Sequence, residues 1–114
     1  MTLFACNPSK KADKTAEKGS VFYTEYDTPY GVPPFDKITE EDYRPAFAYG
    51  MEQHAKEIDS IANNPEAPTF ENTLVALDNS GMILERVSSV FFALEGAEKT
   101  DTIEQIAIEI SPKL

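Results

Sequence analysis

The sequence of 114 residues predicts an all-α protein, on three observations. Apolar residues recur at steps of three and four in three separate stretches, which is the spacing of one buried helix face. A threonine precedes each stretch as an N-cap, with acidic or amide side chains in the following turn. Most prolines lie between the stretches rather than inside them. We therefore expect about three helices after an extended arm, and the length allows one small domain.

Residues 1–20 differ in composition from the rest of the chain. They carry four lysines against Asp13 and Glu17, and no large apolar residue follows Cys6. Such a segment buries too little to offset the entropy of ordering it. We predict a disordered, charged tether over residues 1–20 and a structured part over residues 21–114.

The sequence Leu3-Phe4-Ala5-Cys6 resembles a bacterial lipobox, in which the cysteine receives the lipid. Only four residues precede Ala5, so a secretory signal would need a start upstream of Met1. Otherwise the match is accidental and Cys6 is an inert thiol. Because a lysine-rich tether follows at once, we predict that Cys6 is a lipid-attachment site and that any membrane contact is made through this anchor.

The arm spans residues 21–38 and combines three prolines with five aromatic residues. Proline fixes φ and donates no backbone hydrogen bond, so the arm should be extended and irregular. The aromatic side chains are too many for a solvated linker, and we expect them to pack on the helices. A peptide-binding groove is the alternative. The aromatic residues are Phe22, Tyr23, Tyr26, Tyr30 and Phe35.

The first helix is expected in two pieces because Pro45 suits a first turn better than a helix interior. We predict a single turn at residues 39–43, capped by Thr39, and a longer helix over residues 44–63. Its apolar face carries, in order, Tyr43, Phe47, Met51, Ala55, Ile58 and then Ile61 or Ala62.

The second helix is predicted to begin after Thr69 and to continue for about 21 residues. Its apolar stripe repeats every seven residues, which predicts a nearly antiparallel neighbouring helix. Gly81 lies on the stripe and either permits a close helix approach or marks a break. Residues 87–94 are apolar around almost the whole helix, so we expect a part of the protein outside this chain to cover part of this surface. The stripe consists of Phe70, Leu74, Leu77, Gly81, Leu84, Ser88 and Phe91.

A third helix is predicted from Thr100, with Ile103, Ile106, Ala107 and Ile110 on one face. Pro112 should kink it there. No glycine or other stop signal follows the apolar pattern, which is typical of a chain truncated within an element.

Composition excludes several functions. Net charge −10 is unfavourable for nucleic-acid binding, and a lone cysteine forms no internal disulfide. The only histidine, His54, is followed by Glu57, and an exposed pair is a better reading than a metal site. We attribute the acidic cluster of residues 40–42 to helix capping, and Ser88 and Ser89 to packing.

Three segments resemble the amino-terminal region of bacterial peptidyl-dipeptidases, members of the thimet oligopeptidase family of zinc metallopeptidases, which includes oligopeptidase A. They are TPYGVPPFDKI (28–38), NNPEAPTFENTLVAL (63–77) and SGMILERVSSVFF (80–92). The similarity covers residues 28–114, and none of these motifs is catalytic. It implies a segment of a larger, two-lobed helical protein that surrounds a deep channel.

The resemblance also implies an activity for that larger protein: zinc-dependent removal of dipeptides from the carboxyl ends of oligopeptides. The family's His-Glu-x-x-His zinc helix has no matching position here, so no catalytic or metal-binding residue is assigned and this chain alone should be inactive. Its implied partners are the rest of the peptidase chain and the oligopeptide substrates.

Two alternatives stay open. One is a segment of an endopeptidase similar to oligopeptidase A, and the other is a free-standing helical lipoprotein that binds a partner protein. If Cys6 is lipidated, the protein belongs on the periplasmic face of the bacterial envelope; otherwise it is cytoplasmic.

Overall fold

The computed structural model describes residues 18–114. This part of the chain contains helices and no strand, so the predicted all-α class is confirmed. The elements follow in the order η1 (Ser20–Phe22), η2 (Pro29–Gly31), η3 (Phe35–Lys37), α1 (Glu40–Ala62), η4 (Phe70–Val75), α2 (Ala76–Asp78), α3 (Met82–Ala97), α4 (Asp101–Ile110) and η5 (Ser111–Lys113).

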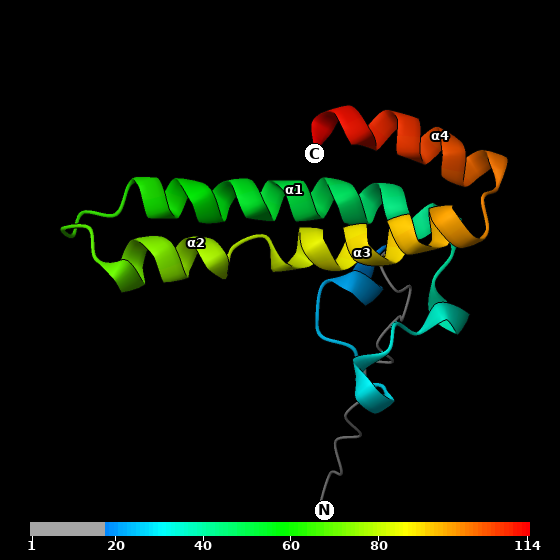
Figure 1. Cartoon of the computed structure of the whole chain (residues 1–114), viewed down its shortest axis with the longest axis horizontal. Coiled ribbons are helices and arrows are strands. Elements are labelled where there is room, and N and C mark those ends of the chain that lie inside the picture. The colour runs from blue at the N-terminus through cyan, green and yellow to red at the C-terminus, as the bar shows by residue number, and fades with distance from the viewer. Residues whose placement is uncertain (1–17) are drawn as a thin grey trace, which may run out of the picture.

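Helix α1 is the central helix, and the other α-helices lie along it (Figure 1). The chain turns back after α1, and η4, α2 and α3 return along it in the opposite direction, as the seven-residue repeat predicted. Helix α4 turns back again and lies along the first part of α1. Helix α1 and the chain that returns along it form a helical hairpin. We call residues 40–50 the inner half of α1. Residues 51–80, which comprise the rest of α1 and the chain up to α3, are called the outer half of the hairpin.

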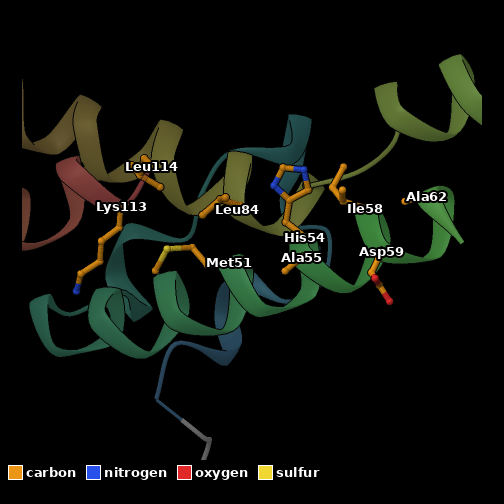
Figure 2. A pocket seen from close by; sticks show the side chains of 9 residues that line it. All are labelled: Met51, His54, Ala55, Ile58, Asp59, Ala62, Leu84, Lys113 and Leu114. Carbon is orange, nitrogen blue, oxygen red and sulfur yellow. The ribbon is translucent and has the colours of Figure 1, made fainter.

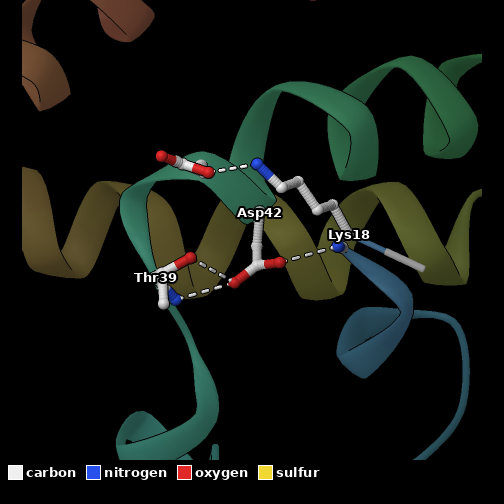
Figure 3. Close-up of polar contacts among 5 residues, drawn as sticks. Lys18, Thr39 and Asp42 are labelled. Atoms are coloured by element: carbon white, nitrogen blue, oxygen red, sulfur yellow. Dashed lines mark hydrogen bonds and ion pairs between the residues drawn. The ribbon is translucent and has the colours of Figure 1, made fainter. Parts of the chain in front are cut away.

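The start of α1 is fixed by Asp42 (Figure 3). Its carboxylate accepts hydrogen bonds from Thr39 N at 2.8 Å, Thr39 Oγ1 at 2.7 Å and Gly19 N at 2.9 Å. Partial burial opposes ionisation of Asp42, but the bonds from Thr39 and Gly19 outweigh it and lower the pKa of this carboxyl. Asp42 therefore caps the helix and also ties the chain before the arm to it.

The expected division of the first helix is wrong. Helix α1 is continuous from Glu40 to Ala62 and contains Pro45. A proline there removes one intrahelical donor, but Tyr43, Ala46 and Phe47 on both sides of it are fully buried. Burial of these side chains outweighs the lost hydrogen bond, so the helix does not break.

Gly81 marks a break in the second helix. It has φ 75°, a left-handed conformation that favours glycine, and it separates α2 from α3. Gly50 on α1 permits a close helix approach, where an added Cβ would lie 3.0 Å from Leu84 Cα. Gly50 follows Tyr43 by seven residues, so the repeat on α1 contained this signal.

The buried core lies at one end of the molecule. The Phe91 ring packs edge-on against Tyr43 and Phe47, with centroids 5.0 and 5.2 Å away. Phe22, from η1, lies 5.5 Å from Tyr43. The remaining buried apolar residues are Ala46, Val87, Val90, Ile103, Ile106 and Ile110. Side chains from η1, α1, α3 and α4 all contribute to this small core, so elements of this chain enclose it.

The described residues cover α3 only in part, and what covers the rest stays a prediction. Val87, Val90 and Phe91 are buried by elements of this chain, whereas Phe92 is 38% exposed and Ala93 is also exposed. The main uncovered apolar surface lies elsewhere, in the outer half of the hairpin, where no residue between 51 and 80 is buried.

The arm packs on the helices only in its first part. Tyr23 stacks on Tyr49 with a centroid distance of 4.0 Å, and Arg86 lies 5.8 Å from the Tyr26 ring. Arg86 Nη1 also donates to the Phe22 carbonyl at 2.9 Å. Tyr30 and Phe35 are exposed, so the prediction that the arm's aromatic side chains pack on the helices is wrong for these two. Just before the arm, Gly19 is the N-cap of η1 and Ser20 is its first residue.

Helix α4 follows the prediction closely. Thr100 Oγ1 accepts from Ile103 N at 3.2 Å, and Ile103, Ile106 and Ile110 are buried. The α-helix ends at Ile110, and Pro112 lies in the short 3₁₀ turn η5. The Arg44 guanidinium holds Glu109 through two hydrogen bonds of 2.9 Å, which join the start of α1 to the end of α4.

Tyr43 provides a test of the core. Its side chain is fully buried and its hydroxyl has no hydrogen-bond partner. Burial raises the pKa of Tyr43 to about 12. Replacement Tyr43→Phe removes an unsatisfied polar atom, so the free energy of unfolding should rise by up to about 1 kcal/mol at pH 7 in urea titrations.

The same variant should change the pH dependence. Below the ordinary tyrosine pKa near 10 the phenol is neutral in both the folded and the unfolded chain. Between about 10 and 12 it ionises first in the unfolded chain, so the free energy of unfolding falls as pH rises. Tyr43→Phe should remove that loss, whereas Tyr30→Phe, at a fully exposed ring, should keep it. A destabilised Tyr43→Phe protein would show that the hydroxyl has a bonding partner.

Candidate functional site

His54 and Glu57 both contact the turn that separates α2 from α3. His54 Nε2 lies 3.3 Å from Ser80 Oγ, and Glu57 Oε2 accepts a hydrogen bond from Gly81 N at 2.6 Å. The prediction that His54 and Glu57 pair with each other is therefore wrong, because each side chain bonds across the hairpin instead. These two contacts fix the break in the second helix against the middle of α1.

An open groove of about 490 Å³ lies beside this turn (Figure 2). Its apolar lining consists of Met51, Ala55, Ile58, Ala62, Leu84 and Leu114. The polar and charged lining comes from His54, Asp59 and Lys113. A smaller hollow of about 320 Å³ shares His54, Leu84 and Leu114 with it. We call the larger one the α1 groove.

The residues around His54 do not form a nucleophilic site. Ser80 Oγ donates to the Leu77 carbonyl at 2.7 Å, and Glu57 bonds Gly81 N instead of orienting the imidazole. A nucleophile, a base and an orienting acid in series are what acyl transfer needs. Ser89 is exposed, so the packing expected of it is not seen, and its Oγ donates to the Arg86 carbonyl of the same helix at 3.1 Å.

A metal site is not present in the part of the chain that the structure describes. Residues 18–114 contain no group of three or more His, Cys, Asp or Glu side chains that could hold a metal ion. The acidic residues 40–42 have other partners: Glu40 accepts from Thr100 Oγ1 at 2.6 Å, Glu41 pairs with Lys18, and Asp42 caps α1. Capping therefore accounts for only part of this cluster.

Cys6 lies outside the described residues, and lipid attachment there stays a prediction. Loss of the protein from the membrane fraction in a Cys6→Ser variant would test it. Between residues 18 and 114, none of the helices has the length and apolar character that a membrane span requires.

Four large apolar side chains of η4 and α2, in the outer half of the hairpin, are exposed. They are between 39% and 65% exposed, although the apolar stripe suggested burial. Exposed apolar side chains of this size are typical of a face that contacts another protein segment. The exposed residues are Phe70, Leu74, Val75 and Leu77.

The turn at Gly81 can be tested with a matched pair of glycines. Gly81→Ala places a side chain at φ 75°, with its Cβ 3.2 Å from the His54 ring. It should lower the free energy of unfolding by about 1–2 kcal/mol. Gly96 lies inside α3 with open space around it, so Gly96→Ala should be neutral or stabilising by up to about 1 kcal/mol. Equal effects in urea titrations would contradict the break at Gly81.

No family model matches the chain. It is 44% identical over 93 residues to the dipeptidyl carboxypeptidase of Escherichia coli strain K12, covering 82% of this chain. It is 46% identical over 86 residues to the dipeptidyl carboxypeptidase of Salmonella typhimurium strain LT2, covering 75% of this chain. The matches span 14% and 13% of those proteins, about one seventh of their length.

Identity at this level over most of the chain confirms the resemblance seen in the sequence. The match extends over 82% of this chain in one relative and 75% in the other. Over most of its length, this chain is therefore related in sequence to a segment of the bacterial dipeptidyl carboxypeptidases.

Proposed function

We propose that this chain is an amino-terminal, non-catalytic helical segment of a peptidyl-dipeptidase that removes dipeptides from the carboxyl ends of oligopeptides. The observation that carries the proposal is the 44–46% identity to two proteins named dipeptidyl carboxypeptidase. The large exposed side chains of the outer hairpin support it, because a segment of a larger protein leaves uncovered the surface that contacts the rest.

The zinc of the proposed parent would be held outside the described residues. Neither His54 nor Glu57 fits a metal site, because both are engaged with the Ser80–Gly81 turn. We infer that this segment contributes structure to the peptidase and no group to the chemical step. The proposed partners are accordingly the remaining peptidase chain and, for the whole enzyme, oligopeptides.

The first test uses the polypeptide alone. It should release no dipeptide from an oligopeptide with a free carboxyl end, and elemental analysis after dialysis should find far less than one zinc per chain. Stoichiometric zinc or hydrolysis would contradict the proposed division of roles.

The second test replaces the matched segment of the E. coli relative with the corresponding residues of this chain. The chimera should release carboxyl-terminal dipeptides, and Gly50→Leu, which forces α1 away from Leu84, should reduce that activity. The matched control Gly96→Ala should not. Cleavage at internal bonds only would favour the endopeptidase alternative, and an inactive but folded chimera would favour a free-standing binding protein.

A further inference from the structure

The tip of the arm, residues 28–35, is a well-defined turn. Gly31 N donates to the Thr28 carbonyl at 3.0 Å, and Thr28 Oγ1 donates to the Val32 carbonyl at 2.5 Å. Three of the eight residues are prolines, which restrict the backbone further. Hydrogen bonds and prolines therefore hold these residues in one shape, and we call them the arm tip.

The arm tip holds its central aromatic residue in an unfavourable conformation. Among the described residues other than glycine, Tyr30 alone has a positive φ, at 61°. This backbone conformation is strained for a residue with a Cβ, and the fully exposed ring gains no packing in return. Val32 and Phe35 beside it are also about half exposed. Strain of this kind is typical of sites where a protein contacts a partner.

The two ends of the arm fix the place of the tip. Before the tip, Phe22 is buried in the core and Tyr23 stacks on Tyr49. After the tip, Thr39 and Asp42 form the cap of α1. The tip itself projects away from α1 and α3, on the side opposite α4 and the carboxyl-terminal end of the chain (Figure 1). Its exposure is therefore unrelated to where the sequence stops.

The size of the arm tip decides between possible occupants. A stable contact between separate proteins buries about 800 Å² on each side and uses about 20–30 residues. The eight residues of the tip carry three large exposed apolar side chains, too few to hold a second copy or an independent protein. A contact of this size suffices within one chain, where the receiving surface is present at a high effective concentration.

Charge and chain length agree with this choice. The arm, residues 21–38, carries Glu25, Asp27 and Asp36 against Lys37, so anionic lipid and nucleic acid would be repelled. A second copy, with its net charge of −10, would be repelled as well. The matches span only 14% and 13% of the two relatives, so most of such a protein lies outside the matched part.

We propose that the arm tip is a docking element that inserts Tyr30 into an apolar hollow of the remaining peptidase chain. The ring acts as an aromatic anchor, and its burial there compensates for the strain at Tyr30. The arm tip lies apart from the outer half of the hairpin (Figure 1), so it adds a second contact that fixes the orientation of the segment. This inference rests on the proposed function, because it names a contact between this segment and the rest of the enzyme.

The test compares the full chain with the chimera of the E. coli relative described above. The 93 matched residues of a 114-residue chain must include the arm tip, so the chimera contains it. In hydrogen exchange followed by mass spectrometry, amides of residues 27–37 should exchange at least about tenfold more slowly in the chimera than in the full chain alone.

Two variants at one position identify the anchor. Tyr30→Asn should abolish the slow exchange in the chimera, because asparagine tolerates a positive φ but has no ring. The matched control Tyr30→Phe keeps the ring, and exchange should stay within about twofold of the unchanged chimera. In the isolated chain, Tyr30→Asn should leave the helical content unchanged and should not lower the urea midpoint, since the ring has no contact there.

The outcomes separate this inference from the proposed function. A chimera that releases dipeptides but leaves residues 27–37 in fast exchange would overturn the docking of the arm tip and leave the proposed function intact. A folded, inactive chimera with slow exchange would support the docking and contradict the proposed activity. Slow exchange already in the isolated chain would also overturn the inference: residues 1–17 would be the occupant, or a second copy if the rate depends on concentration.

Discussion

Burial of only the inner half of the apolar face of α1 determines the rest of the structure. Phe91 packs on Tyr43 and Phe47 there, and the arm and α4 close the remaining sides. Each large side chain buried in this way contributes about 1.5–3 kcal/mol, so the inner half contains most of the stability of the described fold. The outer half has the same helical spacing on α1 but no buried residue.

Helices α1 and α3 approach each other closely where this change occurs. Gly50 allows α1 to approach Leu84, and one turn further along α1, His54 and Glu57 bond to the turn around Gly81. The second helix breaks at that turn, so α3 packs on the inner half while η4 and α2 form a separate piece. Polar contacts at the seam therefore keep the two halves in register where apolar packing ends.

The sequence predicted the elements better than their burial. Threonine caps and apolar residues spaced three and four apart located α1, the second helix of the hairpin and α4, because both signals are local. The spacing could not distinguish Phe91, which is buried, from Phe70 and Leu74, which are exposed, since it identifies an apolar face without identifying what covers it.

Other features depended on contacts between distant residues. Gly19 bonds Asp42 across 23 residues, a contact that composition could not suggest. The bond from Gly81 to Glu57 spans 24 residues, and the α1 groove arises only when Leu84 and Leu114 lie beside Ile58.

The most direct test of a core confined to the inner half is hydrogen exchange on the full chain, followed by mass spectrometry. Amides of residues 43–50 and 87–94 should exchange only through global unfolding, while those of residues 70–78 exchange at least about 100-fold faster. Equal protection of the two regions would contradict a core confined to the inner half.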